Sequence, residues 1–529
     1  MNHIELFAGC GGLSLGLESE GFDLLLANEL SPMASETFAF NHLRLNLKDE
    51  WNPATDRVYW LKSEFDRSDI ESRLKENPLQ LDDPDKAYYS DLEEIRPTSE
   101  SLTRSLLVGS ILDLNRQIEA SPKLRKLLAS GLGSGEVDLV SGGPPCQSFS
   151  LAGLRQHSNE RNSLPWAFAE NVRLIKPKMA LMENVSGILR PFNIDGQSYY
   201  AWYEVAKAFA KEGYVPLCLH VNAKYCGAAQ NRPRYVMLAF RHDVARKIQK
   251  SSDLPSELHE AFEESEAFYK DAKGNDDLEF GALTCHEIGQ SSVFESEILL
   301  PLASNLNSNL VTVEDAIDDL REGGPKSDYV DKINSKSFGN MHGQNIPLSN
   351  NEPRNNGPLV KARFRLYQVM SQMKTDQRRE LTNFIKTGDE ALLSDATLKA
   401  LTNTGDLILP NGKPFPKRDR GKKLSALSEM RTKKQTQRAL IANQPAPAAL
   451  SIPDDACHYH EDELRTLTVR EMARIQSFPD WFEFRSKVTT GGQMRKFQVP
   501  QYTQVGNAVP PLLGKALGKV CKGFLSLVS

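Results

Sequence analysis

The first 30 residues constrain the fold most, because short apolar runs alternate there with a glycine-rich turn. Residues 4–7 form an apolar run of strand length, residues 8–12 form the turn, and residues 13–18 have helical spacing. A second apolar run follows at residues 22–27. This order of strand, turn, helix and strand predicts parallel strands and an α/β fold.

Later segments extend the same pattern and suggest how the chain is divided. Strand-length apolar runs recur at 137–140, 178–182 and 235–240, which predicts a doubly wound, mostly parallel sheet. We therefore assign residues 1–245 to a first domain, with a polar insertion at about 44–104. Periodicity weakens over 246–464, which predicts a second domain. It returns over 465–529, where Thr468 and Glu471 have the spacing of a capping box.

Charge is strongly segregated along the chain. Residues 251–325 contain 18 Asp and Glu but only 3 Lys and Arg, whereas residues 354–440 contain 19 Lys and Arg and 8 Asp and Glu. The net charge of the whole chain is only −5. A basic stretch in an acidic protein is typical of a surface that contacts a polyanion, although a solvated charged face is the alternative.

Other bulk features exclude several classes of protein. No apolar run is long enough to span a membrane, and the N-terminus lacks a signal-peptide pattern, so we expect a cytoplasmic protein that does not enter a membrane. The seven cysteines include no Cys-x-x-Cys pair. We therefore predict neither a disulfide framework nor a bound metal.

Several residues with chemical potential follow the predicted strands. Glu29 ends the second strand, where a carboxylate can accept hydrogen bonds from ribose hydroxyls. Cys146 lies in a Gly/Pro-rich loop directly after the strand that ends at residue 140, and Glu183 closes another strand. Arg232 and Arg234 precede a third. Open α/β sheets hold ligands at such strand ends, so we expect these side chains to lie near one another.

Six segments, in this order, resemble the motif series of the DNA cytosine-5 methyltransferases, the bacterial restriction-modification type included. They are residues 5–12, 144–147, 183–185, 230–234, 465–471 and 504–510. Residues 313–320 resemble a further segment that often follows the arginine motif in this family. The resemblance implies a sheet of the S-adenosylmethionine-dependent methyltransferase type, and it makes 246–464 the inserted target-recognition domain.

The resemblance also implies catalytic roles. Cys146 would be the thiolate that adds to C6 of cytosine, and Glu183 would hydrogen-bond N3 as a general acid. Arg234 would hold O2, while Arg232 would support the loop or lower the pKa of the thiol. Because a stacked base is out of reach of the cysteine, the target base must be flipped out of the duplex.

For S-adenosylmethionine, the resemblance implies a binding site built from both ends of the chain. Its residues would be Phe7, Gly9, Gly11, Gly12, Glu29, Ser110, Ile111, Pro145 and Asn507. Two positions depart from the family pattern. Ser110 stands where the family usually has Asp, and Leu30 stands where an aromatic residue commonly follows the ribose-binding Glu, so we expect weaker cofactor binding.

Double-stranded DNA is the expected partner, together with a restriction endonuclease that acts on the same site, and we expect a monomer. The DNA-contacting residues would be Gln147, Ser150, Lys417, Arg418, Arg420, Lys422 and Lys423. An RNA cytosine-5 methyltransferase and a catalytically inactive DNA-binding regulator are the alternatives. A nicotinamide-dependent oxidoreductase fits poorly, because the turn lacks the Gly-x-Gly-x-x-Gly spacing.

Overall fold

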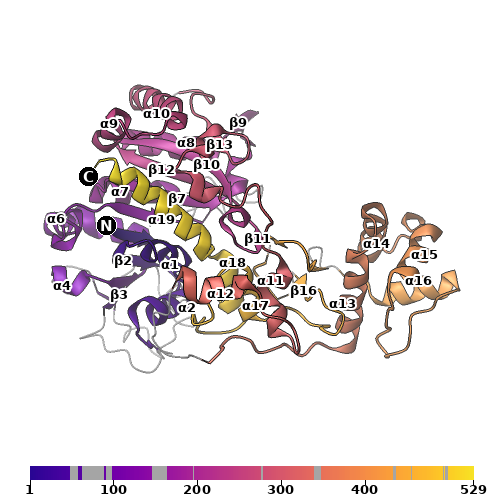
Figure 1. Ribbon diagram of the computed structural model, residues 1–529. Coiled ribbons are helices and arrows are strands. Elements are labelled where there is room, and N and C mark those ends of the chain that lie inside the picture. The colour runs from indigo at the N-terminus through magenta and orange to yellow at the C-terminus, as the bar shows by residue number, and fades with distance from the viewer. Residues whose placement is uncertain are drawn as a thin grey trace.

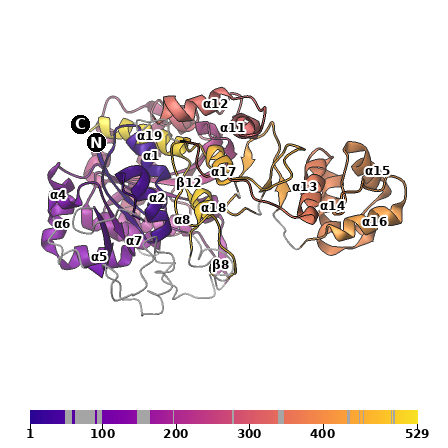
Figure 2. The same cartoon turned by 90° about the horizontal axis from the view of Figure 1, so that it is seen from below.

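The computed structural model describes most of the chain. The described residues are 1–47, 57–61, 89–90, 98–145, 164–194, 196–275, 278–338, 347–432, 437–448, 450–453, 456–492, 494 and 498–528. They form a large α/β lobe built around one sheet and a smaller helical lobe at its side (Figure 1). The two lobes remain separate in the view from below (Figure 2).

A ten-stranded sheet with the order β13-β10-β12-β7-β6-β1-β2-β5-β3-β4 organises the large lobe. Its strands are parallel except β12, which is antiparallel to both β7 and β10. The chain extends the sheet first to one side of β1 and then to the other, which confirms the predicted doubly wound, mostly parallel α/β fold. The strands are β1 (Asn2–Leu6), β2 (Asp23–Glu29), β3 (Val58–Leu61), β4 (Tyr89–Ser90), β5 (Ser105–Val108), β6 (Leu139–Gly142), β7 (Met179–Val185), β10 (Tyr214–Asn222), β12 (Pro233–Arg241) and β13 (Cys285–Glu287).

Helices pack against this sheet and against one another. They are α1 (Gly12–Glu18), α2 (Pro32–Phe38), α4 (Ser99–Leu102), α5 (Ile111–Ala120), α6 (Pro122–Ala129), α7 (Leu164–Ile175), α8 (Ala201–Lys211), α9 (His242–Lys250), α10 (Ser256–Gly274) and α19 (Pro511–Ser526). The first and last helices, α1 and α19, lie side by side. A Cβ added at Gly16 of α1 would lie 2.3 Å from the carbonyl carbon of Gly514, so glycine is what permits this close approach.

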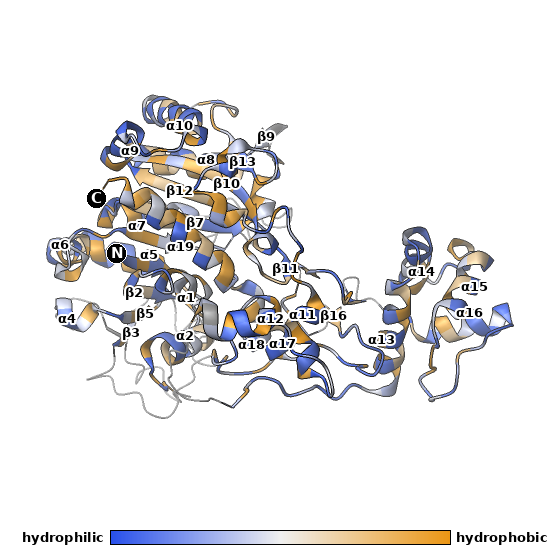
Figure 3. Ribbon diagram, in the orientation of Figure 1, coloured by the Kyte–Doolittle hydropathy of each residue, from blue (hydrophilic) through white to orange (hydrophobic). Residues whose placement is uncertain are grey.

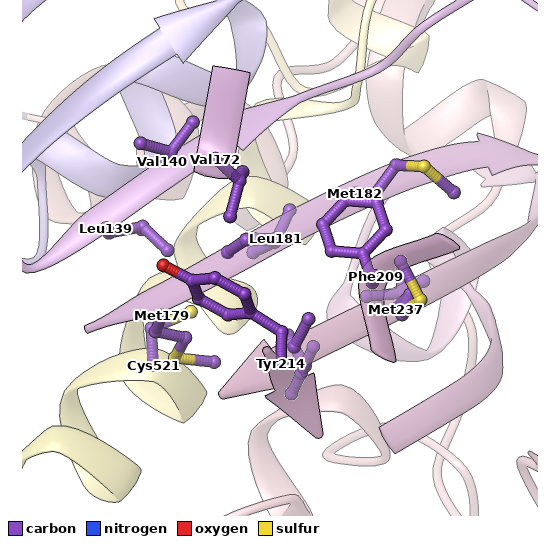
Figure 4. Close-up of a cluster of buried hydrophobic side chains, with 14 of the residues drawn as sticks. Leu139, Val140, Val172, Met179, Leu181, Met182, Phe209, Tyr214, Met237 and Cys521 are labelled. Atoms are coloured by element: carbon purple, nitrogen blue, oxygen red, sulfur yellow. The ribbon is translucent and has the colours of Figure 1, made fainter. Parts of the chain in front are cut away.

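Apolar side chains from neighbouring strands form the centre of the sheet core. Leu139 of β6, Leu181 of β7 and Tyr214 of β10 are all buried in one cluster (Figure 4). The Tyr214 hydroxyl donates a hydrogen bond to the carbonyl of Pro177 at 2.8 Å, which satisfies its polar atom. Cys521 of α19 reaches the same cluster, so the C-terminal helix is part of the core of the large lobe.

Two segments belong to this sheet although the sequence pattern did not predict it. β3, which lies inside the expected insertion at 44–104, pairs with β5. Residues 246–303, expected to open the second domain, supply α10 and the edge strand β13, which pairs with β10. Leu258, Phe262 and Phe268 of α10 are buried in the sheet core. The many acidic residues on the exposed side of α10 obscure this apolar face in the sequence.

The helical lobe has a core of its own. It consists of α13 (Pro358–Ser371), α14 (Thr375–Thr387), α15 (Asp395–Thr404) and α16 (Arg420–Glu429). Phe364, Phe384, Leu401 and Leu427 are fully buried between these helices. Hydrophobic positions concentrate in the central strands of the large lobe, whereas hydrophilic positions dominate α9 and α14 (Figure 3).

A third cluster of apolar residues joins the two lobes. Its main elements are α11 (Val313–Ile317), α12 (Asp328–Asp331), α17 (Val469–Ile475) and α18 (Gln501–Asn507). The short strand β15 (Ala446–Pro447), which pairs with β11 (Gln230–Asn231), contributes Ala446 to this cluster. The pair β14 (Arg438–Ala439) and β16 (Ala456–Cys457) contributes Ala456 to it and Cys457 to the core of the helical lobe. β8 (Phe192–Ile194) and β9 (Gln197–Tyr199) form a separate hairpin. The predicted capping box of Thr468 and Glu471 is present at the start of α17. Among the described residues, no helix is both long and apolar enough to cross a membrane.

Candidate active site

The glycine-rich turn after β1 is fastened to the carboxylate at the end of β2. One oxygen of Glu29 accepts a hydrogen bond from the backbone N–H of Gly9 at 2.7 Å, and the other accepts from Ser31 at 2.8 Å. Gly9 has a φ of +57°, and no atom lies within 4 Å of where its Cβ would stand. The turn therefore leaves open space beside a carboxylate that is fixed in position.

The next two glycines are required by close contacts. A Cβ at Gly11, whose φ is +97°, would lie 2.2 Å from Nε2 of His42, and a Cβ at Gly12 would lie 2.3 Å from the carbonyl oxygen of Val509. Val509 follows α18, so the C-terminal segment lies directly against the N-terminal turn. Asn507, the last residue of α18, lies two residues before Val509 in the sequence and is exposed.

Other residues predicted to hold the cofactor either precede this turn or follow Gly109, whose N–H donates to the carbonyl of Glu29 at 2.9 Å. Phe7 is half-buried with a φ of 54°, and its ring centroid is 6.5 Å from that of Phe168. The Ser110 hydroxyl accepts from the N–H of Leu112 at 3.2 Å and so caps α5. Ile111 is buried in the sheet core. Ser110 thus already has a structural role at the position where the family usually has Asp.

At the end of β7, Glu183 pairs with Arg234 of the neighbouring strand β12. Nε of Arg234 is 2.5 Å from Oε1 of Glu183, and both side chains are buried. Asn184 donates to the carbonyl of Pro144 at 3.0 Å, so the end of β7 is tied to the segment after β6. A Cβ at Gly143 would lie 3.1 Å from Oε2 of Glu183. The Glu183 carboxylate therefore lies directly beside Gly143, three residues before Cys146.

Arg232 is buried and hydrogen-bonded to the C-terminal segment. Its guanidinium donates to the carbonyls of Gly506 at 2.7 Å and Ala508 at 3.0 Å, and to that of Ala448 at 3.4 Å. Burial, followed in importance by the neighbouring Arg234, lowers the pKa of Arg232 well below its ordinary value. Arg232 therefore connects the strand that bears Arg234 to the C-terminal segment that bears Asn507.

Three predicted residues, Cys146, Gln147 and Ser150, lie outside the described residues. The described segment ends at Pro145, which is exposed. β6 ends at Gly142, between Leu6 of β1 and Met182 of β7. The described chain therefore leaves the sheet, three residues before Pro145, between the strand that leads to the glycine-rich turn and the strand that ends at the Glu183–Arg234 pair.

The predicted DNA-contacting cations of the helical lobe differ in exposure. Lys417, Arg418, Arg420 and Lys422 are exposed, whereas Lys423 is buried within the lobe. Lys417 lies 3.3 Å from Asp406 and Arg420 pairs with Asp395. Such exposed pairs are weak and can exchange partners. Among the residues that the structure describes, no cluster of His, Cys, Asp and Glu has the arrangement of a metal site.

Two polar residues that the sequence did not single out also shape this region. Gln504 of α18 accepts from the Thr37 hydroxyl at 2.6 Å and donates to the carbonyl of Val499 at 3.0 Å. Glu5 belonged to a recognised motif but received no role, and it is buried within β1. An acidic residue inside an apolar strand was the signal available in the sequence.

Known proteins are similar to this chain along most of its length. A family model described as C-5 cytosine-specific DNA methylase matches residues 1–64 and 114–523. The type II methyltransferase M.DdeI of Desulfomicrobium norvegicum is 25% identical over 525 residues, covering 98% of this chain and 88% of the relative. The type II methyltransferase M.AgeI of Thalassovita gelatinovora is 25% identical over 550 residues, covering 99% and 100%.

Solved structures with detectable similarity include a DNA modification methyltransferase encoded within an E. coli prophage, with 18% identity, a TM-score of 0.45 and coverage of 99% of both chains. The S. pombe Dnmt2 methyltransferase has 12% identity and a TM-score of 0.36, with 100% of this chain and 99% of that chain covered. The family match spans both lobes and includes every segment of the predicted motif series. The chain therefore belongs to the C-5 cytosine-specific DNA methylase family.

Proposed function

We propose that this protein transfers a methyl group from S-adenosylmethionine to C5 of a cytosine in a specific sequence of duplex DNA, as the modification enzyme of a restriction-modification system. The observation that carries the proposal is the buried Glu183–Arg234 pair, because it lies beside the segment that leads to Cys146. A carboxyl group and a guanidinium group can together bind N3 and O2 of cytosine. The type II methyltransferases among the relatives support the restriction-modification context.

The N-terminal turn fits the cofactor. Gly9 leaves open space, Glu29 is fixed beside it to accept hydrogen bonds from the ribose, and Phe7 lies at its edge. Gly11 and Gly12 would lie under the amino-acid end, and Ser110, Ile111, Pro145 and Asn507 would complete the site. When bound, S-adenosylmethionine supplies an electrophilic methyl group on a sulfonium.

The protein's own residues then act on a cytosine that has been flipped out of the helix. The Cys146 thiolate forms a bond to C6, and the electron density that builds on the ring is stabilised by a hydrogen bond from protonated Glu183 to N3 and by Arg234 at O2. C5 thereby becomes nucleophilic and accepts the methyl group. A base then takes the C5 proton, the C5–C6 double bond re-forms, and the bond between sulfur and C6 breaks, which regenerates the Cys146 thiolate.

The helical lobe supplies target recognition in this proposal. Lys417, Arg418, Arg420 and Lys422 are exposed on it and would contact phosphates, which positions the duplex without reading its sequence. Lys423 is buried, so it would contribute less to this surface. Base-specific contacts from the same lobe would select the cytosine.

Transfer of tritium from labelled S-adenosylmethionine to nucleic acid tests the proposed function. We expect labelling of duplex DNA, no labelling of RNA, and no labelling by the Cys146→Ala variant. Bisulfite sequencing of DNA from a host that expresses the protein should then identify one protected sequence. Labelling of RNA alone would favour an RNA methyltransferase, and binding of DNA without any labelling would favour an inactive regulator.

A further inference from the structure

Glu5 is a carboxyl group buried directly below the glycine-rich turn. It lies within β1, between Ala27 of β2 and Ser141 of β6, and its side chain is 2% exposed. Its partner among the described residues is the hydroxyl of Ser14 on α1, and no described cation pairs with it. An ionised carboxylate without a cation is costly in such a place, so burial favours the neutral acid.

The other acids near Glu5 have more hydrogen-bond or charge partners than Glu5 itself. Glu18 of α1 is 2.7 Å from Nδ1 of His42 and 3.5 Å from the guanidinium of Arg104. Glu29 accepts two backbone hydrogen bonds, which oppose the rise that burial causes in its pKa. The titratable groups around Glu5 are His3 on the same strand, Cys10 in the turn, Glu18 on α1, Glu29 at the end of β2, and His42 and Arg104 next to Glu18.

These neighbours do not favour an ionised Glu5. Burial raises the pKa of Glu5 to about 8, and Glu18 and Glu29 add to the rise, while the Ser14 hydrogen bond opposes it. His3 supplies no positive charge, because burial lowers its pKa to about 4. Glu5 is therefore mostly protonated at neutral pH in the protein without a ligand.

We propose that Glu5 releases its proton when the cationic cofactor binds to the turn above it, so that binding of S-adenosylmethionine is coupled to proton release. This inference rests on the proposed function. The sulfonium and ammonium groups would bring positive charge close to a site that holds several carboxyl groups, and a nearby cation favours the ionised form of an acid. The O–H bond of Glu5 breaks, the proton passes to the solvent buffer, and the Ser14 hydroxyl donates to the new carboxylate.

The direction of the pH dependence follows from this coupling. Between the pKa of Glu5 in the complex and about pH 8, the free protein holds a proton that the complex does not hold, so affinity for S-adenosylmethionine rises with pH. Above that pH the proton is already absent, and the contribution of Glu5 to the pH dependence disappears. S-adenosylhomocysteine lacks the sulfonium charge, so it should release a smaller fraction of a proton.

Titration calorimetry at pH 7 in two buffers of different ionisation enthalpy measures the proton release. For the wild-type protein we expect about one proton released per S-adenosylmethionine bound. Glu5→Gln retains the shape of the neutral acid and should bind without this release. Ser14→Ala is the matched control, because it removes the hydrogen-bond partner but keeps the acid, and its proton release should persist.

The infrared spectrum gives a second readout that needs no variant. The carbonyl band of a protonated carboxyl group should disappear when S-adenosylmethionine is added to the wild-type protein. Proton release by Glu5→Gln equal to that of the wild type, or an unchanged carbonyl band, would overturn the inference. Binding without proton release would also overturn it but leave the proposed function intact, whereas a failure of the wild type to bind S-adenosylmethionine would contradict both.

Discussion

Two groups of cations, the arginines beside Glu183 in the large lobe and the exposed cations of the helical lobe, lie in opposite environments. In the large lobe, Arg232 and Arg234 are buried and each is held by specific carbonyl or carboxylate oxygens. In the helical lobe, Arg418 and Lys422 are exposed. Catalysis requires charged groups that are fixed in position, whereas nonspecific binding of phosphates requires exposed charged groups that can exchange partners.

Because the two groups of cations lie in different environments, mutations at them should change different properties of the protein. Removing one partner of a buried hydrogen-bonded charge leaves the other unsatisfied, which costs about 3–5 kcal/mol. Removing an exposed charge costs little stability but weakens attraction to a polyanion. We therefore expect changes in the large lobe to affect the rate of methyl transfer and changes in the helical lobe to affect DNA affinity.

Among the variants that test this comparison, the largest effect is expected from Glu183→Gln. The amide keeps the shape of the side chain but cannot transfer a proton to N3, so the methyl-transfer rate should fall by about 10²–10⁴. Single-turnover kinetics with saturating DNA measures this rate. Glu287→Gln on the exposed edge strand β13 is the matched control and should leave it unchanged. An unaltered rate in Glu183→Gln would show that Glu183 does not act as the general acid.

An intermediate effect is expected from charge reversal of Lys417, Arg418 and Lys422 to Glu. Affinity for all duplex sequences should fall by on the order of 10- to 100-fold at moderate salt, and the salt dependence should flatten, because fewer counterions are released. Fluorescence anisotropy over a series of salt concentrations measures both quantities.

The matched control for this charge reversal changes three exposed cations of α9, Arg246, Lys247 and Lys250, to Glu. These residues lie on the large lobe, away from the helical lobe (Figure 1). If both triple variants lose the same affinity, net charge governs binding and the helical lobe is not the phosphate-contacting surface.

The smallest effect is expected at the joint between the lobes. The buried amide of Gln368 on α13 donates to the carbonyls of His458 at 3.0 Å and His460 at 2.6 Å. Gln368→Leu leaves these carbonyls without that donor, which should cost about 1–3 kcal/mol of local stability. Hydrogen exchange should increase at residues 456–463, and the KM for DNA should rise several-fold while kcat stays nearly constant.

Gln372→Leu is the matched control for the joint, because Gln372 is the C-cap residue of the same helix but is exposed. It should change neither hydrogen exchange nor KM. A fall in kcat without a change in KM for Gln368→Leu would show that the joint acts on the catalytic groups and not on the position of the helical lobe.

Sequence patterns predicted those parts of the molecule whose determinants are local. The apolar runs became β6, β7 and β12, and Thr468 and Glu471 form the expected capping box. Family membership was also predictable, since ordered motifs span the chain. Each of these features depends on neighbouring residues or on short spacings.

Features that depend on distant residues could not be predicted in the same way. The pairing of β13 with β10 places Cys285 opposite Cys218, and no local sequence pattern encodes that register. The contact of Arg232 with Gly506 joins residues that are 274 positions apart. The burial of Lys423 depends on how α16 packs within its lobe, because its neighbour Lys422 is exposed on the same helix.

Duplex DNA that carries 5-fluorocytosine at the target position tests the central claim most directly. Fluorine replaces the proton that must leave C5, so methyl transfer can occur but the bond between sulfur and C6 cannot then break. We expect an adduct that survives denaturing electrophoresis, requires S-adenosylmethionine and the correct sequence, and is absent with Cys146→Ala. Methylation of ordinary DNA without any adduct on the fluorinated duplex, or an adduct that persists in Cys146→Ala, would contradict covalent catalysis by Cys146.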